Sequence, residues 1–197
     1  MESVRRGRAR SGAAPFGTAP SDSVPPTAAE AEGAAREACL RLLTSRPRSR
    51  HELEARLREK GVEPEVAARV LDRMEQVELV DDAAFAQAWV HQRHTFSGRG
   101  RRALAMELRT KGVADHHAAA ALAEVDDRAE AERARELVHR KLRSLAVPAD
   151  ARERAAVVRK LVGVLARRGY AQGLAFTVVR DELAAAGADT EDLDPQG

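Results

Sequence analysis

The sequence has little cysteine and no long hydrophobic run, and each shortage excludes a class of protein. Cys39 is the single cysteine, so neither an intramolecular disulfide nor a zinc cluster built on several cysteines can form. No stretch approaches the roughly 18 consecutive apolar residues of a membrane span, and no apolar segment follows the basic residues near the start, as an export signal would require. We therefore expect a cytoplasmic protein without a membrane span.

Aromatic residues are scarce as well. Phe, Trp and Tyr together make up 3% of the chain, whereas hydrophobic residues as a whole reach 44%. A core built from Leu, Val and Ala favours helices that pack closely through small side chains, because strands are enriched in aromatic and β-branched residues. The composition predicts an all-α protein.

Charged residues are abundant, but the two signs nearly cancel. The net charge is +2, although charged residues account for 32% of the chain. Arginine supplies most of the positive charge, and a guanidinium can bind phosphate through two hydrogen bonds or form ordinary ion pairs in solvent. The position of the arginines therefore has to indicate any partner, because a GC-rich genome would also enrich Arg and Ala.

The start of the chain differs from the rest. Residues 1–33 combine Gly, Ala, Pro, Ser and Thr without an apolar period, which predicts a disordered arm. Helical periodicity follows: Ser49 and Glu52 have the spacing of a capping box, Gly61 can end the helix, and Pro64 suits the first turn of the next one. The first periodic segment is expected to hold three helices.

The same pattern then returns twice. A pair of leucines, a basic residue, a glycine and a hydrophobic residue recur at shifts of 51 and then 57 residues. Such self-similarity is typical of repeat proteins, whose small units stack and share surfaces. We expect three tandem three-helix repeats that form an elongated, curved, monomeric array. The repeats are predicted at residues 34–80, 81–126 and 127–187, with an acidic flexible tail at 188–197.

The middle repeat carries the most specific pattern. Phe85 and Trp89 lie one helical turn apart and are expected to anchor its core, and Asp81 or Asp82 can cap their helix. The pattern reads Asp81-Asp82-x-x-Phe85-Ala86-x-x-Trp89-Val90-x-x-Arg93, then Gly98-x-x-Arg101-x-x-Leu104-x-x-Glu107-Leu108-x-x-Lys111-Gly112-Val113.

This pattern resembles the signature of the RecX regulatory proteins. The first repeat adds Arg50 and Lys60-Gly61-Val62, and the third adds Arg168-Gly169-Tyr170, so the resemblance covers about residues 34–183. It implies a helical protein that binds the RecA–DNA filament along its groove and inhibits RecA ATPase, strand exchange and co-protease activity. Recombinational DNA repair and the SOS response would be modulated in this way. The arm and the acidic tail lie outside the family's pattern.

Arginines recur just before the second helix of the first two repeats. Positive charge at a helix N-terminus costs a few tenths to about 1 kcal/mol, so phosphates or an acidic protein surface would explain its presence; a solvated charged face is the alternative. The predicted partner-binding residues are Arg48, Arg50, Arg93, Arg99, Arg101, Arg102, Lys111, Arg167, Arg168 and Tyr170. The predicted core residues are Leu53, Leu57, Phe85, Trp89, Leu104, Leu108, Leu161 and Leu165.

The remaining motifs do not indicate an enzyme. The segment from Gly98 to Ala103 has G-x-G-x-x-A spacing, but a helix rather than a strand is expected before it, and no phosphate-binding G-x-x-x-x-G-K-[ST] loop occurs. His91 and His94 have a chelating spacing without an evident third ligand. We expect no catalytic residue, metal or cofactor. Two alternatives to a RecA regulator remain open: a helical DNA-binding module, or a generic helical adaptor that acts without RecA.

Overall fold

Helices make up most of the chain that the structure describes. The computed structural model describes residues 27–145, 148, 150–188 and 190. Most of the predicted arm, residues 1–26, and the tail from residue 191 onward lie outside these residues. Within them the chain forms nine α-helices and no strand. The helices are α1 (Ala28–Ser45), α2 (Arg50–Glu59), α3 (Pro64–Gln76), α4 (Asp82–Ser97), α5 (Arg101–Thr110), α6 (Asp115–Ala123), α7 (Asp127–Leu142), α8 (Ala151–Arg167) and α9 (Gln172–Ala185).

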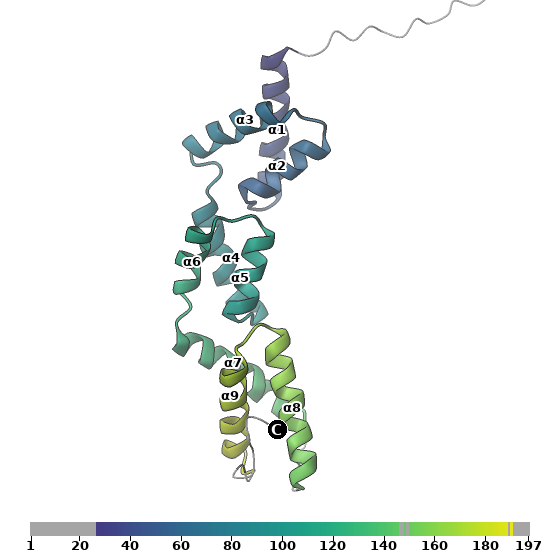
Figure 1. The fold of residues 1–197 in the computed structure, drawn as a ribbon, viewed down its shortest axis with the longest axis vertical. Helices are drawn as coiled ribbons and strands as arrows, with labels where there is room; N and C mark the ends of the chain where they lie inside the picture. Colours follow the sequence, from purple (N-terminus) through teal and green to yellow (C-terminus); the bar gives the residue numbers. More distant parts are fainter. Residues whose placement is uncertain (1–26, 146–147, 149, 189, 191–197) are drawn as a thin grey trace, which may run out of the picture.

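The helices are arranged as three units along an elongated column (Figure 1). We call α1–α3 repeat 1, α4–α6 repeat 2 and α7–α9 repeat 3. In the view of Figure 1 the second helices, α2, α5 and α8, lie on the right of the column, and the third helices lie on the left. The predicted all-α architecture of tandem three-helix repeats is confirmed. No helix among the described residues is both long and apolar enough to cross a membrane.

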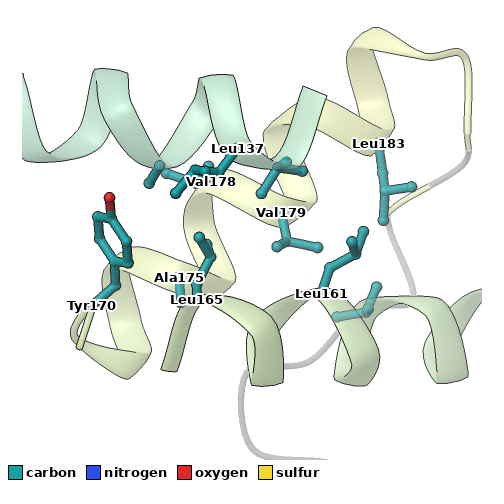
Figure 2. Close-up of a cluster of buried hydrophobic side chains, with 11 residues drawn as sticks. Leu137, Leu161, Leu165, Tyr170, Ala175, Val178, Val179 and Leu183 are labelled. Carbon is teal, nitrogen blue, oxygen red and sulfur yellow. The ribbon is translucent and has the colours of Figure 1, made fainter. Parts of the chain in front are cut away.

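Each repeat has its own hydrophobic core. The three buried clusters lie within residues 35–80, 85–125 and 134–183, and the two leucines of every second helix are at most 1% exposed. Figure 2 shows the cluster of repeat 3, where side chains from α7, α8 and α9 converge. We expected neighbouring repeats to share surfaces because each has few apolar residues. Each buried apolar cluster lies within one repeat, so other residues form the surfaces that neighbouring repeats share.

The first helix begins earlier than predicted. Residues 28–33 were assigned to the disordered arm, but α1 starts at Ala28. Thr27 and Glu30 form a capping box, in which the Thr27 N–H donates to Glu30 Oε2 at 2.8 Å. One turn later Glu32 pairs with Arg69 of α3 at 2.7 Å. Capping and this ion pair stabilise a segment that has no apolar period, which explains why periodicity alone missed it.

The turn between the second and third helices has the same conformation in every repeat. Gly61, Gly112 and Gly169 have φ values of +77°, +69° and +90°. This left-handed conformation strains residues with a Cβ atom, so glycine suits the position. We call these the glycine turns of repeats 1, 2 and 3. Two of them form part of the contacts between repeats.

Candidate interaction surface

Repeats 1 and 2 meet where the start of α2 contacts the glycine turn of repeat 2. We call this contact joint 1. The buried Ser49 hydroxyl donates a hydrogen bond to the Lys111 carbonyl at 2.6 Å, and the Arg50 N–H donates to Asp82 Oδ1 at 2.8 Å. A Cβ atom on Gly112 would overlap the His51 side chain. Joint 1 therefore depends on the absence of a side chain at Gly112.

An ion-pair chain crosses joint 1. Lys111 Nζ lies 2.7 Å from Glu52 Oε1, and the same oxygen lies 3.0 Å from Arg46 Nη2. Burial raises the pKa of Glu52, but hydrogen bonds and charge from Arg46 and Lys111 outweigh it and lower the pKa from 4.5 to about 2. The Glu52 N–H binds Ser49 as the capping box predicts. The Glu52 carboxylate, however, stabilises the joint instead of completing the box.

Repeats 2 and 3 meet in the equivalent way, at what we call joint 2. The Gly100 N–H donates to the Arg168 carbonyl at 2.9 Å, and the Arg102 N–H donates to the Gly169 carbonyl at 3.2 Å. A Cβ atom on Gly100 would come within 2.7 Å of the Gly169 carbonyl, and one on Gly169 would overlap the Ala103 backbone. Joint 2 is therefore a direct contact between two backbone segments.

Side chains reinforce joint 2 from both repeats. The Arg101 N–H and its Nε each donate to the Glu130 carboxylate at 2.8 Å, and Arg101 also pairs with Asp127. In the opposite direction, Arg168 Nη1 donates to the Ser97 carbonyl at 2.6 Å. The Glu130 side chain is only 4% exposed, so its charge relies on Arg101 for compensation.

Tyr170 completes joint 2 at one end of the repeat 3 core (Figure 2). Tyr170 is 2% exposed, and its hydroxyl donates to the Gly98 carbonyl at 3.3 Å. Burial raises the pKa of Tyr170 to about 12, so the hydroxyl stays a hydrogen-bond donor at neutral pH. We predicted Tyr170 as a partner-binding residue, but the structure places it inside the fold.

A second charged cluster surrounds Trp89 in repeat 2. Trp89 Nε1 and Arg93 Nε each donate to Glu107 Oε2 at 2.9 Å, and Arg99 lies 3.1 Å from the other Glu107 oxygen. The Lys111 ammonium lies 4.7 Å from the centre of the Trp89 ring, a cation–π contact. Hydrogen bonds and charge from Arg93 together lower the pKa of Glu107, with Trp89 and Arg99 adding to the effect.

Trp89 corrects our expectation of a core anchor. It packs against the core of repeat 2 beside the buried Phe85, with ring centres 5.8 Å apart, but it is only half-buried. Its indole N–H needs a hydrogen-bond partner, and Glu107 supplies one at the edge of the core. The other predicted core residues are buried.

The structure thus divides the ten predicted partner-binding residues into two groups. Eight have hydrogen-bond or ion-pair partners within this chain, so their binding to another molecule stays a prediction. Those eight are Arg48, Arg50, Arg93, Arg99, Arg101, Lys111, Arg168 and Tyr170. Only Arg102 and Arg167 are exposed without an ion pair among the described residues. Sequence reasoning missed this division because the acidic partners lie up to 59 residues away, as for Lys111 and Glu52.

Exposed basic residues lie on both α5 and α8, the second helices of repeats 2 and 3. Arg102 and Arg109 flank Met106 on one face of α5, and Met106 is 72% exposed. On α8, Arg159, Lys160 and Arg167 are exposed. None of these five cations has an ion-pair partner within the described part of the chain. On α2, by contrast, Arg56 and Arg58 are paired with Glu59 and Glu54. We call the five cations and Met106 the basic face.

The described residues contain no group of three His, Cys, Asp or Glu side chains that could hold a metal ion. His94, one of the chelating-spaced pair, has its Nδ1 atom 2.8 Å from the Arg99 carbonyl. Its role in the structure is therefore to close the α4–α5 turn.

Comparison with known proteins gives one family throughout. The family model described as "RecX, first three-helix domain" matches residues 35–74, and the model described as "RecX, second three-helix domain" matches residues 81–122. These segments fall within repeats 1 and 2. "Regulatory protein RecX" of Mycolicibacterium smegmatis is 50% identical over 153 residues, covering 78% of this chain and 81% of that protein. The RecX protein of Streptomyces coelicolor is 48% identical over 164 residues, covering 83% and 85%.

Solved structures show the same fold. A crystal structure of RecX from Lactobacillus salivarius superposes with a TM-score of 0.68 at 20% identity, covering 78% of this chain and 97% of that one. A second RecX crystal structure gives a TM-score of 0.65 at 22% identity, covering 78% and 73%.

Proposed function

The chain belongs to the RecX family of regulatory proteins, and we propose that it binds the RecA–DNA filament and inhibits RecA ATPase, strand exchange and co-protease activity. It would thereby modulate recombinational DNA repair and the SOS response in the cytoplasm. The observation that carries the proposal is the basic face on α5 and α8. These cations recur on successive repeats of an elongated array, and such spacing suits a long, repetitive, acidic partner.

The basic face is a better candidate than the arginines at the helix starts. Arg50 and Arg101 already compensate acidic residues of this chain, so binding a partner would first require breaking ion pairs within repeat 1 and at joint 2. Arg102 and Arg109 need no such rearrangement, and Met106 between them offers apolar contact. Exposed apolar groups flanked by arginine are typical of protein–protein interfaces.

A paired substitution tests this proposal. Wild-type protein should slow ATP hydrolysis by RecA on single-stranded DNA. Arg102→Gln with Arg109→Gln should weaken the inhibition several-fold without loss of stability, because both side chains are exposed. Arg56→Gln with Arg58→Gln is the matched control: it removes the same charge from α2, where both arginines are neutralised internally. Normal ATP hydrolysis by RecA at a several-fold excess of the wild-type protein would refute the proposed inhibition. Full inhibition by the Arg102→Gln, Arg109→Gln variant would refute the basic face as the binding surface.

DNA binding without RecA is the second candidate, and the charge distribution favours it over a generic adaptor. Residues 127–187 contain 13 Lys and Arg against 8 Asp and Glu, a net charge of +5, whereas residues 81–126 contain 6 of each. Phosphate contacts release counterions, so binding of an oligonucleotide should weaken steeply with salt. Tight binding of DNA by the chain alone, together with unchanged RecA hydrolysis, would favour this candidate.

A further inference from the structure

A cleft opens between the C-terminal ends of α7 and α9, outside the joints and away from the basic face. Leu142 and Leu145 line it from the α7 side, Ala185 lines it from α9, and His139 and Arg143 stand at its rim. The two leucines are partly buried against the core of repeat 3. The cleft therefore offers an apolar floor with His139, Arg143 and Glu182 beside it.

Three exposed cations lie at the end of α7 beside this cleft: Arg143 lines it, and Arg140 and Lys141 are the sequence neighbours of its lining residues. Arg140, Lys141 and Arg143 are exposed and have no ion pair among the described residues. Each helix C-terminus contributes about half a negative charge, and Glu182 lies 3.4 Å from His139. Glu182 also lines the cleft, and the three cations carry about one charge more than Glu182 and the two helix ends together, even with His139 neutral. An acidic ligand would be attracted here.

The chain itself carries a matching segment. Residues 189–197 contain Asp189, Glu191, Asp192 and Asp194, with Leu193 between the last two, and no basic residue. This segment follows Ala188, which packs against the core of repeat 3 and donates its N–H to the Leu183 carbonyl at 3.0 Å. The acidic segment thus starts only a few residues beyond Ala185 of the cleft. Leu193 is the fifth residue after Ala188, so it can lie up to about 17 Å away.

We propose that residues 189–197 dock in this cleft, with Leu193 on the apolar floor and the flanking carboxylates paired with Arg140, Lys141 and Arg143. The docked segment would then compete with other anions for this end of repeat 3. Docking requires neither RecA nor DNA, so the proposal stands or fails independently of the proposed function. The covalent link adds a high effective concentration, so weak contacts suffice.

A spin label tests the docking in the full-length chain. The native Cys39 is fully buried, so Gln196→Cys can be labelled selectively with a nitroxide. Amide signals of Lys141–Leu145 should broaden, whereas those at the start of α7, residues 128–135, should not. Tethering alone could bring the label close. The control is therefore the same labelled chain with Glu191→Gln, Asp192→Asn and Asp194→Asn, in which the broadening should be lost.

Two outcomes would overturn the docking proposal. Equal broadening in the neutralised chain would show that the tether alone brings the label near. Unchanged broadening in a labelled Leu193→Ser chain would show that charge alone attracts the tail to the end of α7 and that Leu193 does not bind in the cleft. Clear loss in both variants supports the proposal.

A fluorescent single-stranded oligonucleotide tests the competition. At low salt the neutralised tail should raise the affinity several-fold. This gain should disappear when Arg140, Lys141 and Arg143 are all changed to Gln. Equal affinity of the wild-type and neutralised-tail chains would refute the competition.

Discussion

At joint 1 the start of α2 reaches the next repeat through a side chain, whereas at joint 2 the start of α5 reaches it through the backbone. Ser49 donates from its hydroxyl to the glycine turn of repeat 2, but Gly100, at the equivalent position, donates from its N–H. A glycine at this position lets two backbones approach, because a Cβ atom there would come within 2.7 Å of the facing carbonyl. The residue type at this position, serine at joint 1 and glycine at joint 2, thus decides how closely the two backbones approach.

The arginines that follow differ in the same sense. The Arg50 side chain pairs with Asp72 and Glu75 within repeat 1, while the Arg101 side chain pairs with Asp127 and Glu130 of the next repeat. Only the backbone N–H of Arg50 crosses joint 1, to Asp82. Joint 2 therefore has more bonds between repeats at equivalent positions. We expect the unfolding of repeats 2 and 3 to be more strongly coupled than the unfolding of repeats 1 and 2.

Gly169→Ala should have the largest effect, because it attacks the backbone contact of joint 2. The left-handed conformation costs a residue with Cβ roughly 1–2 kcal/mol, and the new methyl would overlap the Ala103 backbone, adding about 1–3 kcal/mol of overpacking. The free energy of unfolding, measured by urea denaturation, should fall by about 2–5 kcal/mol in total. A loss below about 1 kcal/mol would show that joint 2 is looser than described.

Gly112→Ala should cost less than Gly169→Ala. The backbone strain is similar, but the methyl would meet the His51 side chain rather than a backbone segment. His51 is exposed, so the start of α2 can shift to relieve part of the overlap. We expect a loss of about 1–3 kcal/mol in the same urea experiment. A loss larger than that of Gly169→Ala would reverse the ranking of the two joints.

Arg101→Ala and Arg50→Ala compare the side chains of the two joints. Without Arg101, the buried Glu130 carboxylate keeps a backbone N–H but loses its charged partner, which costs about 1–3 kcal/mol. Asp72 and Glu75 are 57% and 40% exposed, so losing Arg50 should cost less than about 1 kcal/mol. Chemical denaturation of both variants measures the difference. Equal losses of unfolding free energy in the two variants would mean that the burial of Glu130 does not determine how much the loss of Arg101 destabilises the protein.

The sequence predicted the repeats well because their signals are local. Paired leucines and a glycine stop lie within one or two helical turns, and helix geometry alone turns them into a buried stripe and a left-handed cap. The partners of the arginines could not be predicted in this way. Arg101 meets Glu130 only because two repeats stack, and no local pattern specifies how they stack. The sequence predicted Trp89 as a core residue, although it is half-buried, because its hydrogen-bond partner Glu107 lies on another helix.

Acid should weaken joint 1 through Glu52. Its folded pKa of about 2 is below the ordinary 4.5, so its contribution to stability is complete above pH 4.5 and is lost as the pH falls towards 2. Wild type should be more stable than Glu52→Gln at neutral pH, and the difference should shrink across this interval. Urea denaturation of both proteins at several pH values measures it. A difference that does not change with pH would contradict the role of the carboxylate charge.

Gly61→Ala should have the smallest effect of the three glycine substitutions, because the glycine turn of repeat 1 forms no joint with another repeat among the described residues. Gly61 has the same left-handed conformation as Gly112 and Gly169, yet a Cβ atom there would meet nothing within 4 Å. The substitution therefore introduces backbone strain without overlap, and the loss should be roughly 1–2 kcal/mol. Asparagine tolerates the left-handed conformation better than alanine, so Gly61→Asn should reduce the free energy of unfolding by less still. The losses from Gly169→Ala and Gly112→Ala beyond that of Gly61→Ala then measure the two joints alone. If Gly61→Ala cost as much as Gly169→Ala, strain would explain the whole series, and close approach of the repeats would contribute nothing measurable.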